Sequence, residues 1–334
     1  MADRQPTMSD VAREAGVSPI TVSRVLNNYE FVKSDTREKV LRAVALTGYR
    51  PNLAARALVT RKSHVLGVLV ADAFGHGPTA ALWAIEDAAG DAGYAVTVVS
   101  LRGDDRDAIL AGLQRLNAQG VDGIVMIAPQ HEATSLEILD VEGTPVVTLS
   151  AFASEVLRPI MLDSVAGSRA AVRHLARLGH RTIAHLAGPE GWAAAEARLR
   201  GWRDESAALG LDIGPVAYGD WTAQTGHALA PGLLSDARVT AIYAASDAMA
   251  QGALLALHER GLRVPEDVSL VGFDDAPEAE YFIPPLTTVR QDFETLGRRC
   301  IASVVELIEG RVAPAFEPLE PTLVVRASTA VPRV

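Results

Sequence analysis

Hydrophobic residues recur at two different spacings along this chain. Residues 8–48 carry apolar positions three and four apart, the spacing of one helix face. From residue 65 onward, short continuous apolar runs such as Val65–Val70 alternate with helix-like segments. Apolar runs of this length between helices are typical of parallel strands covered on both faces. The pattern therefore predicts a small all-α head followed by an α/β body.

The head begins with two short helices joined at Gly16. Glycine suits the left-handed conformation of a tight turn, so Gly16 ends the first helix. Ser18 can cap the second helix, with Pro19 at the first helical position, where its missing N–H costs nothing. The inward residues are predicted to be Val11, Ala12 and Ala15, then Val22, Val25 and Leu26; the outward ones are Pro19, Ile20, Thr21, Ser23 and Arg24. An ordinary αα-hairpin is the alternative, but short polar groups and an arginine on the outer face are typical of a helix that enters the DNA major groove.

A third helix is predicted to start at Ser34 as its N-cap and to end at Gly48, packing through Val40, Leu41 and Val44. After it, Asn52 can cap a short helix through about Leu58, which is marginal by itself. By composition alone this segment is a helical linker. The alternative is a hinge helix that orders on DNA and inserts Leu58 between base pairs in the minor groove.

The body shows a repeating rhythm of strands and helices that exceeds one typical sheet domain, so two lobes are expected. Ligands of such sheets bind beyond the carboxyl ends of the strands. The expected strands span residues 65–70, 95–100, 122–128, 145–150, 182–187, 240–245 and 269–273, and the expected helices 78–92, 107–118, 167–178, 193–209 and 247–260.

The charge of the chain is divided in the same place as its hydrophobic pattern. The whole chain of 334 residues has a net charge of −10, but residues 1–62 hold 11 Lys and Arg against 6 Asp and Glu. A basic head on an acidic body confines attraction for phosphates to one end. Cys300 is the only cysteine, which excludes an intrachain disulfide and suits the cytoplasm. The absence of a signal-like start and of any long apolar run predicts no membrane association.

The sequence offers little for catalysis. It has no phosphate-binding Walker loop, no Gly-x-Ser-x-Gly elbow and no His-Glu-x-x-His motif. Its eight histidines show no metal-ligand spacing, and His180 and His185 are expected at a helix end and in a strand. We therefore expect no enzyme, no cofactor and no metal. A sugar-binding transport receptor would share the body but would need a signal peptide and no DNA head.

Several ordered motifs together resemble the lactose-repressor/galactose-repressor (LacI/GalR) family of bacterial transcription regulators. The resemblance covers nearly the whole chain. In the head it rests on residues 7–27, on Tyr49-Arg-Pro-Asn and on Arg56-Ala-Leu; in the body it rests on residues 175–189, 198–202, 219–221, 246–253, 268–275 and 284–293.

The resemblance implies a helix-turn-helix head and a periplasmic-binding-protein-like body of two doubly wound parallel-sheet lobes, with three crossovers and an effector cleft between them. The implied domains are a DNA-binding domain at 1–48, a hinge helix or linker at 49–62, an N-terminal lobe at 63–161 plus 290–321, and a C-terminal lobe at 162–289 plus 322–334. It also implies a homodimer on a near-palindromic duplex operator. A tetramer is not expected, because the C-terminal residues show no heptad segment.

By resemblance, Pro19, Ile20 and Arg24 take the base-reading positions of the recognition helix. Arg24 can donate two hydrogen bonds to a guanine. Contacts that position the head on phosphates, or cap its helices, are expected from Thr7, Ser18, Thr21, Ser23 and Asn27. Leu58 takes the position of the minor-groove wedge, with Asn52 and Ala55 in the same hinge helix, so the resemblance favours the hinge over a plain linker.

The resemblance also places an effector site. Arg198 and Asp274 are expected to grip hydroxyl pairs of a sugar, and Trp221 to stack on its ring. Taken without the resemblance, Arg198 reads as a surface ion pair, Trp221 as a core residue and Asp274 as a turn cap. Trp192 either narrows the pocket or adds a second stacking face. The remaining expected lining residues are His76, Pro78, Ala81, Ser150, Leu162, Ser246, Gln291 and Phe293.

These features predict a repressor of carbohydrate-metabolism genes that a small mono- or disaccharide releases from its operator. One alternative is a corepressor-dependent regulator of the same family with a purine or phosphosugar ligand. The sequence does not tell whether the ligand releases the protein from DNA or promotes its binding, because this depends on which conformational state the ligand prefers. The alternative from another class is the sugar-binding receptor.

Overall fold

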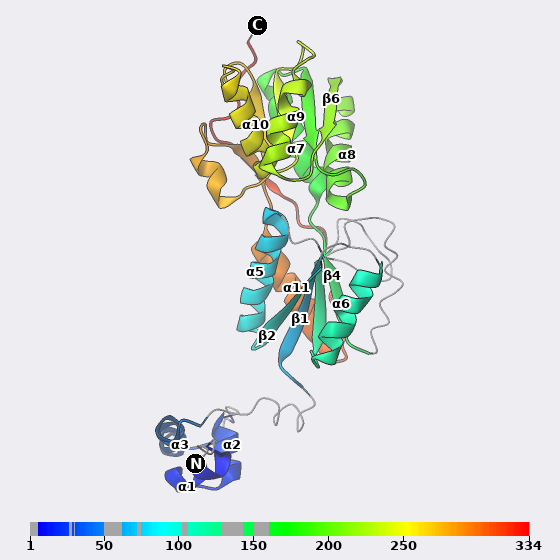
Figure 1. The fold of residues 1–334 in the computed structure, drawn as a ribbon. Helices are drawn as coiled ribbons and strands as arrows, with labels where there is room; N and C mark the ends of the chain where they lie inside the picture. The colour runs from blue at the N-terminus through cyan, green and yellow to red at the C-terminus, as the bar shows by residue number, and fades with distance from the viewer. Residues whose placement is uncertain are drawn as a thin grey trace. The chain divides into compact units, whose positions relative to one another are not determined.

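The computed structural model describes residues 6–26, 29, 31–49, 62–71, 75–101, 106–127, 143–149 and 160–333. Contacts within the chain divide it into two compact units, Met1–Ser63 and His64–Val334. We call the first unit the head and the second the body, and Figure 1 shows the elements of each.

The head contains three helices, α1 (Met8–Ala15), α2 (Pro19–Leu26) and α3 (Ser34–Thr47). Gly16 follows α1 with φ 66°, and the N–H of Val17 donates back to the carbonyl of Ala12 at 3.0 Å. The hydroxyl of Ser18 accepts from the N–H of Thr21 at 3.1 Å. The predicted glycine turn and the predicted serine cap are both confirmed.

The head core is small and two predictions about α3 are wrong. Val40 and Ala43 are buried there, whereas Leu41 is 51% exposed. Positions 40, 43 and 44 share one helix face, and position 41 is turned about 100° away from position 40. Ser34 is the first residue of α3 and Lys33 takes the N-cap position, so Ser34 does not cap the helix. The core otherwise combines Val11, Ala12, Val22 and Val25, with Ala15, Leu26 and Val44 packed against them.

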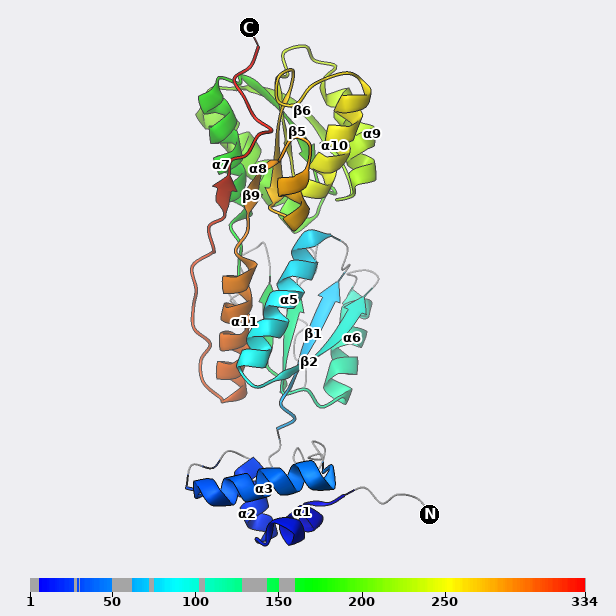
Figure 2. The same cartoon turned by 90° about the vertical axis from the view of Figure 1, so that its left-hand side faces the viewer.

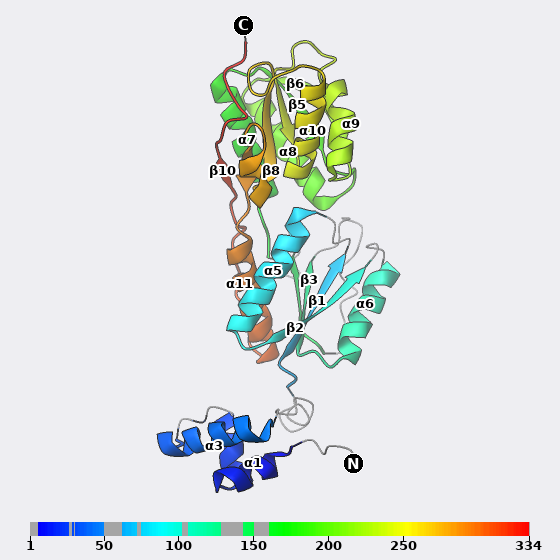
Figure 3. The same cartoon turned by 60° about the vertical axis from the view of Figure 1, so that its left-hand side comes forward.

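The first lobe of the body is built on a four-stranded parallel sheet with strand order β2-β1-β3-β4. Helices α5 and α11 pack together on one face and α6 covers the other, as Figure 3 shows. Residues of β1 alternate between these two cores, Leu66, Val68 and Val70 facing α5 and α11 and Leu69 facing α6. The elements are β1 (Val65–Ala71), α5 (His76–Asp91), β2 (Ala95–Leu101), α6 (Arg106–Ala118), β3 (Gly123–Ile127), β4 (Val146–Leu149) and α11 (Phe293–Ile308).

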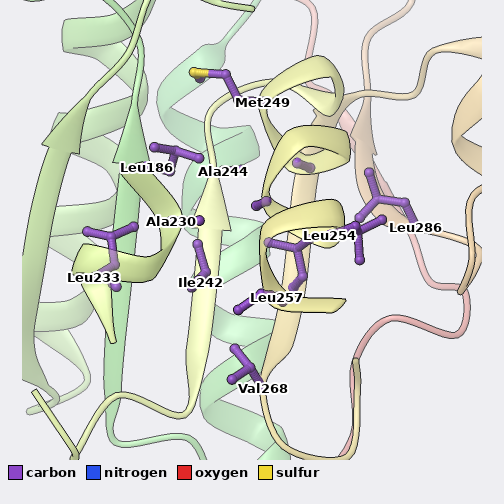
Figure 4. Packing of buried hydrophobic residues seen from close by; sticks show 14 of the residues in the cluster. Leu186, Ala230, Leu233, Ile242, Ala244, Met249, Leu254, Leu257, Val268 and Leu286 are labelled. Atoms are coloured by element: carbon purple, nitrogen blue, oxygen red, sulfur yellow. The ribbon is translucent and has the colours of Figure 1, made fainter. Parts of the chain in front are cut away.

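The second lobe is built on a six-stranded sheet with strand order β10-β9-β8-β7-β5-β6. Helices α9 and α10 cover one face, and Figure 4 shows Ile242 of β7 packed among Leu233 of α9 and Leu257 of α10. Helices α7 and α8 cover the other face around Trp202 and Tyr243. The elements are α7 (Ser164–Leu178), β5 (Thr182–Ala187), α8 (Ala193–Ala208), β6 (Asp212–Tyr218), α9 (Ala223–Leu233), β7 (Ala241–Ala244), α10 (Asp247–Glu259), β8 (Ser269–Asp274), the 3-10 helix η2 (Pro277–Tyr281), β9 (Thr287–Arg290) and β10 (Thr322–Val324).

The chain passes between the lobes more than once, as Figure 2 shows for its C-terminal third. It leaves the second lobe after β9, forms α11 in the core of the first lobe, and returns to β10. Strand β10 runs antiparallel to β9, which makes it the exception in an otherwise parallel sheet. On the way back, the carbonyl of Leu319 accepts from the N–H of Asp163 at 2.9 Å, so the crossing segments contact each other.

All the strands and helices that the pattern predicted for the body are present, and their ends differ from the predicted ones by at most three residues. The pattern did not predict β6, α9, β9, α11 and β10. Strand β6 contains Gly214 and Pro215 at the edge of its sheet, and α9 contains Pro231, so both lack a clean hydrophobic period. In the described ranges, no helix combines the length and the hydrophobicity that crossing a membrane requires.

Candidate functional site

The exposed face of α2 carries the predicted DNA-reading residues. Pro19, Ile20 and Arg24 are exposed, Ile20 by 66%. The guanidinium carbon of Arg24 lies 5.4 Å from the centre of the Tyr29 ring. Thr21 and Ser23 are half-buried beside them. The face therefore offers an apolar side chain and an arginine to a partner, as a helix that reads base edges does.

Two of the predicted phosphate-contacting residues already have local roles at helix starts. The N–H and the hydroxyl of Thr7 both donate to Oδ2 of Asp10, at 2.9 and 2.6 Å. Ser18 caps α2 through the N–H of Thr21. These bonds fix where α1 and α2 begin and so hold the exposed face in place. The predictions for Asn27, Asn52, Ala55 and Leu58 fall outside the described residues.

The body contains a cavity of about 670 Å³ that is lined from both lobes. A volume of this size is typical of sites for small organic ligands. Of the predicted effector residues, Ser150 lies outside the described ones, and the other eleven all line this cavity: His76, Pro78, Ala81, Leu162, Trp192, Arg198, Trp221, Ser246, Asp274, Gln291 and Phe293. Lining residues that the sequence analysis missed include Trp83, Asp247, Gln251, Glu278 and Phe282.

Arg198, Asp274 and Gln291 form a buried polar cluster, each less than a tenth exposed. Arg198 lies on α8 and donates to Oδ1 of Asp274 at 3.3 Å and to the carbonyl of Ala245. Gln291 donates its amide to the same Oδ1 at 2.7 Å. Both of these contacts among the described residues use Oδ1, which leaves Oδ2 to accept from a ligand hydroxyl. The burial of Arg198 excludes the alternative of a surface ion pair.

The guanidinium of Arg198 is also held between aromatic rings. Its central carbon lies 3.9 Å from the centre of the Phe273 ring and 5.2 Å from that of Trp221. Contacts of a cation with ring faces are favourable and fix the plane of the guanidinium. Its Nε is buried and has no hydrogen-bond partner among the described residues. The ring contacts and the hydrogen bonds thus hold the cluster in a fixed arrangement.

Two tryptophans line the same cavity. The ring centres of Trp221 and Trp192 are 6.2 Å apart and their planes are inclined by 54°. Trp221 packs so closely on Gly188 that a Cβ at that glycine would lie 2.3 Å from the indole. Both tryptophans are half-buried, so Trp221 is a wall of the cavity and not a fully enclosed core residue.

Ser246 and Asp247 begin α10 at the cavity wall. The hydroxyl of Ser246 caps the helix by accepting from the N–H of Met249 at 3.2 Å. Asp247 accepts from the hydroxyl of Thr288 at 2.5 Å and from the N–H of Ala276 at 2.8 Å. Burial, with the nearby Asp274, raises the pKa of Asp247 to about 8 despite these bonds. Burial also raises the pKa of Asp274, which Arg198 and His76 oppose.

Backbone strain is concentrated around the cavity. Trp221, Asp274 and Asp275 have positive φ values of 70°, 115° and 55°. Residues with side chains rarely adopt such values, and strain of this kind persists where the surrounding structure enforces it, commonly at ligand sites. Two arginines anchor the carboxylate of Asp275, Arg290 at 2.5 Å and Arg326 at 2.7 Å. These contacts hold the end of β8, and with it Asp274, in a fixed position.

The first lobe contributes a different set of groups. The start of α5 provides His76, Pro78 and Ala81, and the ring of His76 lies 6.0 Å from that of Phe293 in an edge-on arrangement. Leu162 completes this apolar side. Among the described residues, no group of three or more His, Cys, Asp or Glu side chains is arranged to hold a metal ion. Cys300 lies buried in the core of this lobe.

The two units match two known families. Residues 7–52 match "Bacterial regulatory proteins, lacI family", and residues 172–329 match "Periplasmic binding protein-like domain". The lactose operon repressor of Escherichia coli (strain K12) is 36% identical over 98% of this chain and 91% of that protein. The regulator CelR of Thermobifida fusca is also 36% identical, over 97% of this chain and 98% of that protein.

The solved structures agree with these relatives. The lac repressor dimer bound to operator and an anti-inducer superimposes with a TM-score of 0.86, at 34% identity over 98% of this chain and all of that chain. A complex of the regulator CelR with cellobiose gives a TM-score of 0.71 at 33% identity, over 97% of this chain and 99% of that chain. The chain therefore belongs to the lacI family of bacterial regulatory proteins and is a cytoplasmic DNA-binding transcriptional regulator, not an enzyme.

Proposed function

We propose that this regulator is a repressor that binds a near-palindromic operator as a homodimer and is released from it by a small uncharged sugar. The observation that carries this proposal is the cavity of the body, where a buried arginine–carboxylate–amide cluster lies beside two tryptophans. Paired polar groups suit adjacent hydroxyls, and indole faces suit the C–H groups of a sugar ring. No catalytic step is required of these residues.

The charges of the cavity favour a neutral ligand over a phosphorylated one. Arg198, the one arginine among the described residues that line it, is already paired with Asp274 and the carbonyl of Ala245. Asp274 and Glu278 also line it, and negative charge on these carboxylates would repel a phosphate. A repressor named PurR, from Haemophilus influenzae, and a ribose operon repressor are also similar to this chain, at 31% and 33% identity. The choice of a sugar therefore rests on the cavity and not on the relatives.

The proposed dimer places two recognition helices on two half-sites of the operator. A two-fold symmetric protein matches a palindrome, because each head then reads an equivalent sequence. The body has exposed apolar side chains that suit such an interface, among them Leu255 on α10, Tyr281 and Ile283, the last 93% exposed. The solved relative with operator is described as a dimer.

Release by the sugar requires that it prefer one arrangement of the lobes. Gln291 lies between β9 and α11 and Phe293 is the first residue of α11, so the cavity includes part of a crossover. The bond from Gln291 to Asp274 ties this crossover to the end of β8. A ligand that fills the cavity contacts both lobes and the chain between them, and any difference in its affinity for two lobe arrangements shifts their populations.

The test has two stages. Purified protein is screened by thermal shift against neutral sugars, their phosphates and purines, because a ligand that binds the folded state raises Tm. The operator is selected from randomised duplexes, and its affinity is measured with and without the hit. We expect a neutral sugar to raise Tm and to weaken operator binding. A purine or phosphosugar as the only hit, or a sugar that tightens operator binding, would overturn the proposal.

An Arg24→Ala variant is the control for this experiment. It lacks the guanine-reading side chain and should lose about 5- to 150-fold in affinity for the selected operator, from ~1–3 kcal/mol of lost base contact. Its sugar response in the thermal shift should equal that of the wild type, because Arg24 belongs to the head and the cavity to the body.

A further inference from the structure

Two aromatic side chains of the head are exposed, although its hydrophobic core is small. Tyr29 and Phe31 lie between α2 and α3 in the sequence and are 47% and 84% exposed. This exposure forgoes the free energy that burial of the two rings would provide. Their ring centres are 5.7 Å apart and their planes are inclined by 63°, a favourable edge-to-face arrangement. The two rings therefore support each other on the surface of the head.

The backbone of Tyr29 is anchored to both neighbouring helices. Its N–H donates to the carbonyl of Arg24, in the last turn of α2, at 2.9 Å. Its carbonyl accepts from the guanidinium of Arg37 on α3 at 3.0 Å. Arg37 also donates to the carbonyl of Val25 on α2, at 3.5 Å. Because these bonds tie residue 29 to α2 and α3, they fix the point from which its ring extends.

The ring of Tyr29 lies against the side chain that is predicted to read a base. The guanidinium carbon of Arg24 is 5.4 Å from the ring centre. Among the described residues, the N–H groups of this guanidinium form no hydrogen bond or ion pair. A ring face attracts the charge of an arginine without using its N–H donors, and a guanine needs two of these donors for O6 and N7. The ring thus restrains Arg24 and leaves its donors free.

We infer that Tyr29 is a positioning residue for base reading, whose ring, supported by Phe31, holds the guanidinium of Arg24 in place before the operator binds. This inference rests on the proposed function, because it requires that Arg24 read a base of the operator. An exposed arginine loses the freedom of a long side chain when it binds, and a contact that restrains it beforehand lowers this cost.

The inferred role differs from a direct contact of Tyr29 with DNA. A ring that acts through Arg24 affects only the base pair that Arg24 reads. A tyrosine hydroxyl that bonded to a phosphate would instead strengthen binding to all sequences alike. The two roles therefore differ in base preference and in their dependence on Arg24.

The experiment measures the preference of each variant for the selected operator over one in which the base pair read by Arg24 is replaced in one half-site. That pair is the one at which Arg24→Ala loses its preference. Tyr29→Leu should lower the preference about two- to fivefold, the contribution of such a contact at an exposed site. Tyr29→Phe keeps the ring without the hydroxyl and should retain the preference. Phe31→Ala should cause a smaller loss of the same kind.

Two controls separate positioning from other roles. In the Arg24→Ala background, Tyr29→Leu should have no further effect on operator affinity. Tyr218→Leu is the same change at an exposed position of β6 and should leave the preference unchanged. Circular dichroism and Tm verify that the variants are folded.

Three results would overturn the inference and leave the reading role of Arg24 intact. The first is an unchanged preference in Tyr29→Leu, with or without a uniform loss of affinity. The second is an equal loss in Tyr29→Phe, since the hydroxyl and not the ring would then matter. The third is a further loss when Tyr29→Leu is added to Arg24→Ala. If Arg24→Ala keeps its preference at every base pair, the inference and the proposed reading role are both wrong.

Discussion

The two lobes contribute unlike surfaces to the same cavity. The second lobe supplies the buried polar groups, Arg198, Ser246, Asp247 and Asp274, and each has hydrogen bonds to its own lobe. The first lobe supplies small and apolar groups from the start of α5, such as Gly77, Pro78 and Ala81, with His76 and Thr79 as the polar members among the described residues there. The second lobe therefore holds its hydrogen-bonding groups in place before a ligand binds, whereas the first lobe mainly determines the shape of the cavity.

This difference follows from where the residues lie in the fold. The polar residues of the second lobe follow β7, end β8 or lie on α8, and ion pairs such as Arg326 with Asp275 hold the loops of this sheet. Groups fixed in this way lose little freedom on binding. We therefore expect substitutions in the second lobe to change intrinsic affinity, and conservative ones at the start of α5 to change it little.

The largest effect is expected for Arg198→Met. This change keeps the length of the side chain but leaves the carboxylate of Asp274 buried without its cation, and breaking a buried pair costs about 3–5 kcal/mol. Effector affinity, measured by calorimetry, should fall more than about 100-fold, with a lower Tm. Arg200→Met, an exposed neighbour on α8, is the control and should change neither quantity. Unchanged affinity in the Arg198 variant would remove it from the site.

A pair of glycine substitutions compares the two walls directly. The Cβ of Gly188→Ala would lie 2.3 Å from the ring of Trp221, so the indole must move and effector affinity should fall about tenfold. The Cβ of Gly77→Ala would lie 3.8 Å from the ring of Phe293, an ordinary contact, and alanine also favours the helix. That variant should bind the effector within about twofold of the wild type. Equal losses in both variants would contradict the proposed division between the lobes.

The smallest effect is expected for the pH dependence of stability, which we attribute to Asp247 in the second lobe. The pKa of Asp247 is raised from 3.8 to about 8 in the folded protein, mainly by burial. The folded state therefore retains a proton that the unfolded state releases, and this contribution to stability is lost as the pH rises from about 4 to about 8. In Asp247→Asn the amide replaces the neutral acid: its oxygen can accept from Ala276 and its NH₂ can donate to Thr288.

The Tm of Asp247→Asn relative to the wild type should therefore increase between about pH 5 and pH 8. The increase should be ~2–4 °C for each kcal/mol of unfolding free energy that the wild type loses and the variant keeps. Asp212→Asn, at an exposed position of β6, should follow the wild-type profile. If the Tm of the Asp247 variant and that of the wild type instead change with pH in parallel, Asp247 is ionised in the folded protein throughout this range.

The local sequence predicted the elements well because their signals are short-range. Gly16 with positive φ, the Ser18 cap and the alternation of apolar runs with helices each depend on a few neighbouring residues, and each is present in the structure. The predictions were wrong or missing where the spacing of hydrophobic residues was ambiguous or was interrupted by other residues. Leu41 fits a hydrophobic pattern but lies beside the buried face of α3, and Pro231 obscured α9.

The candidate site depended on more than local signals. The resemblance of motifs pointed to Arg198, Trp221 and Asp274, which are 76 residues apart along the chain at the extremes but share one cavity. Nothing in their local sequence brings them together. Asp247 was missed, although it follows a buried strand directly after Ser246, because its environment is set by Thr288 and Asp274 from other strands.

By itself, the sequence determined a basic helical head with an outward-facing Arg24, an acidic α/β body and the strands from which the cavity is built. Only the tertiary structure decided that Arg198 and Gln291 both bond to the same oxygen of Asp274, that Asp247 is held near a second carboxylate, and that the planes of Trp192 and Trp221 diverge. The reason is physical. Helix and strand signals arise between residues a few positions apart, whereas burial, ion pairing and ring geometry arise where distant segments meet.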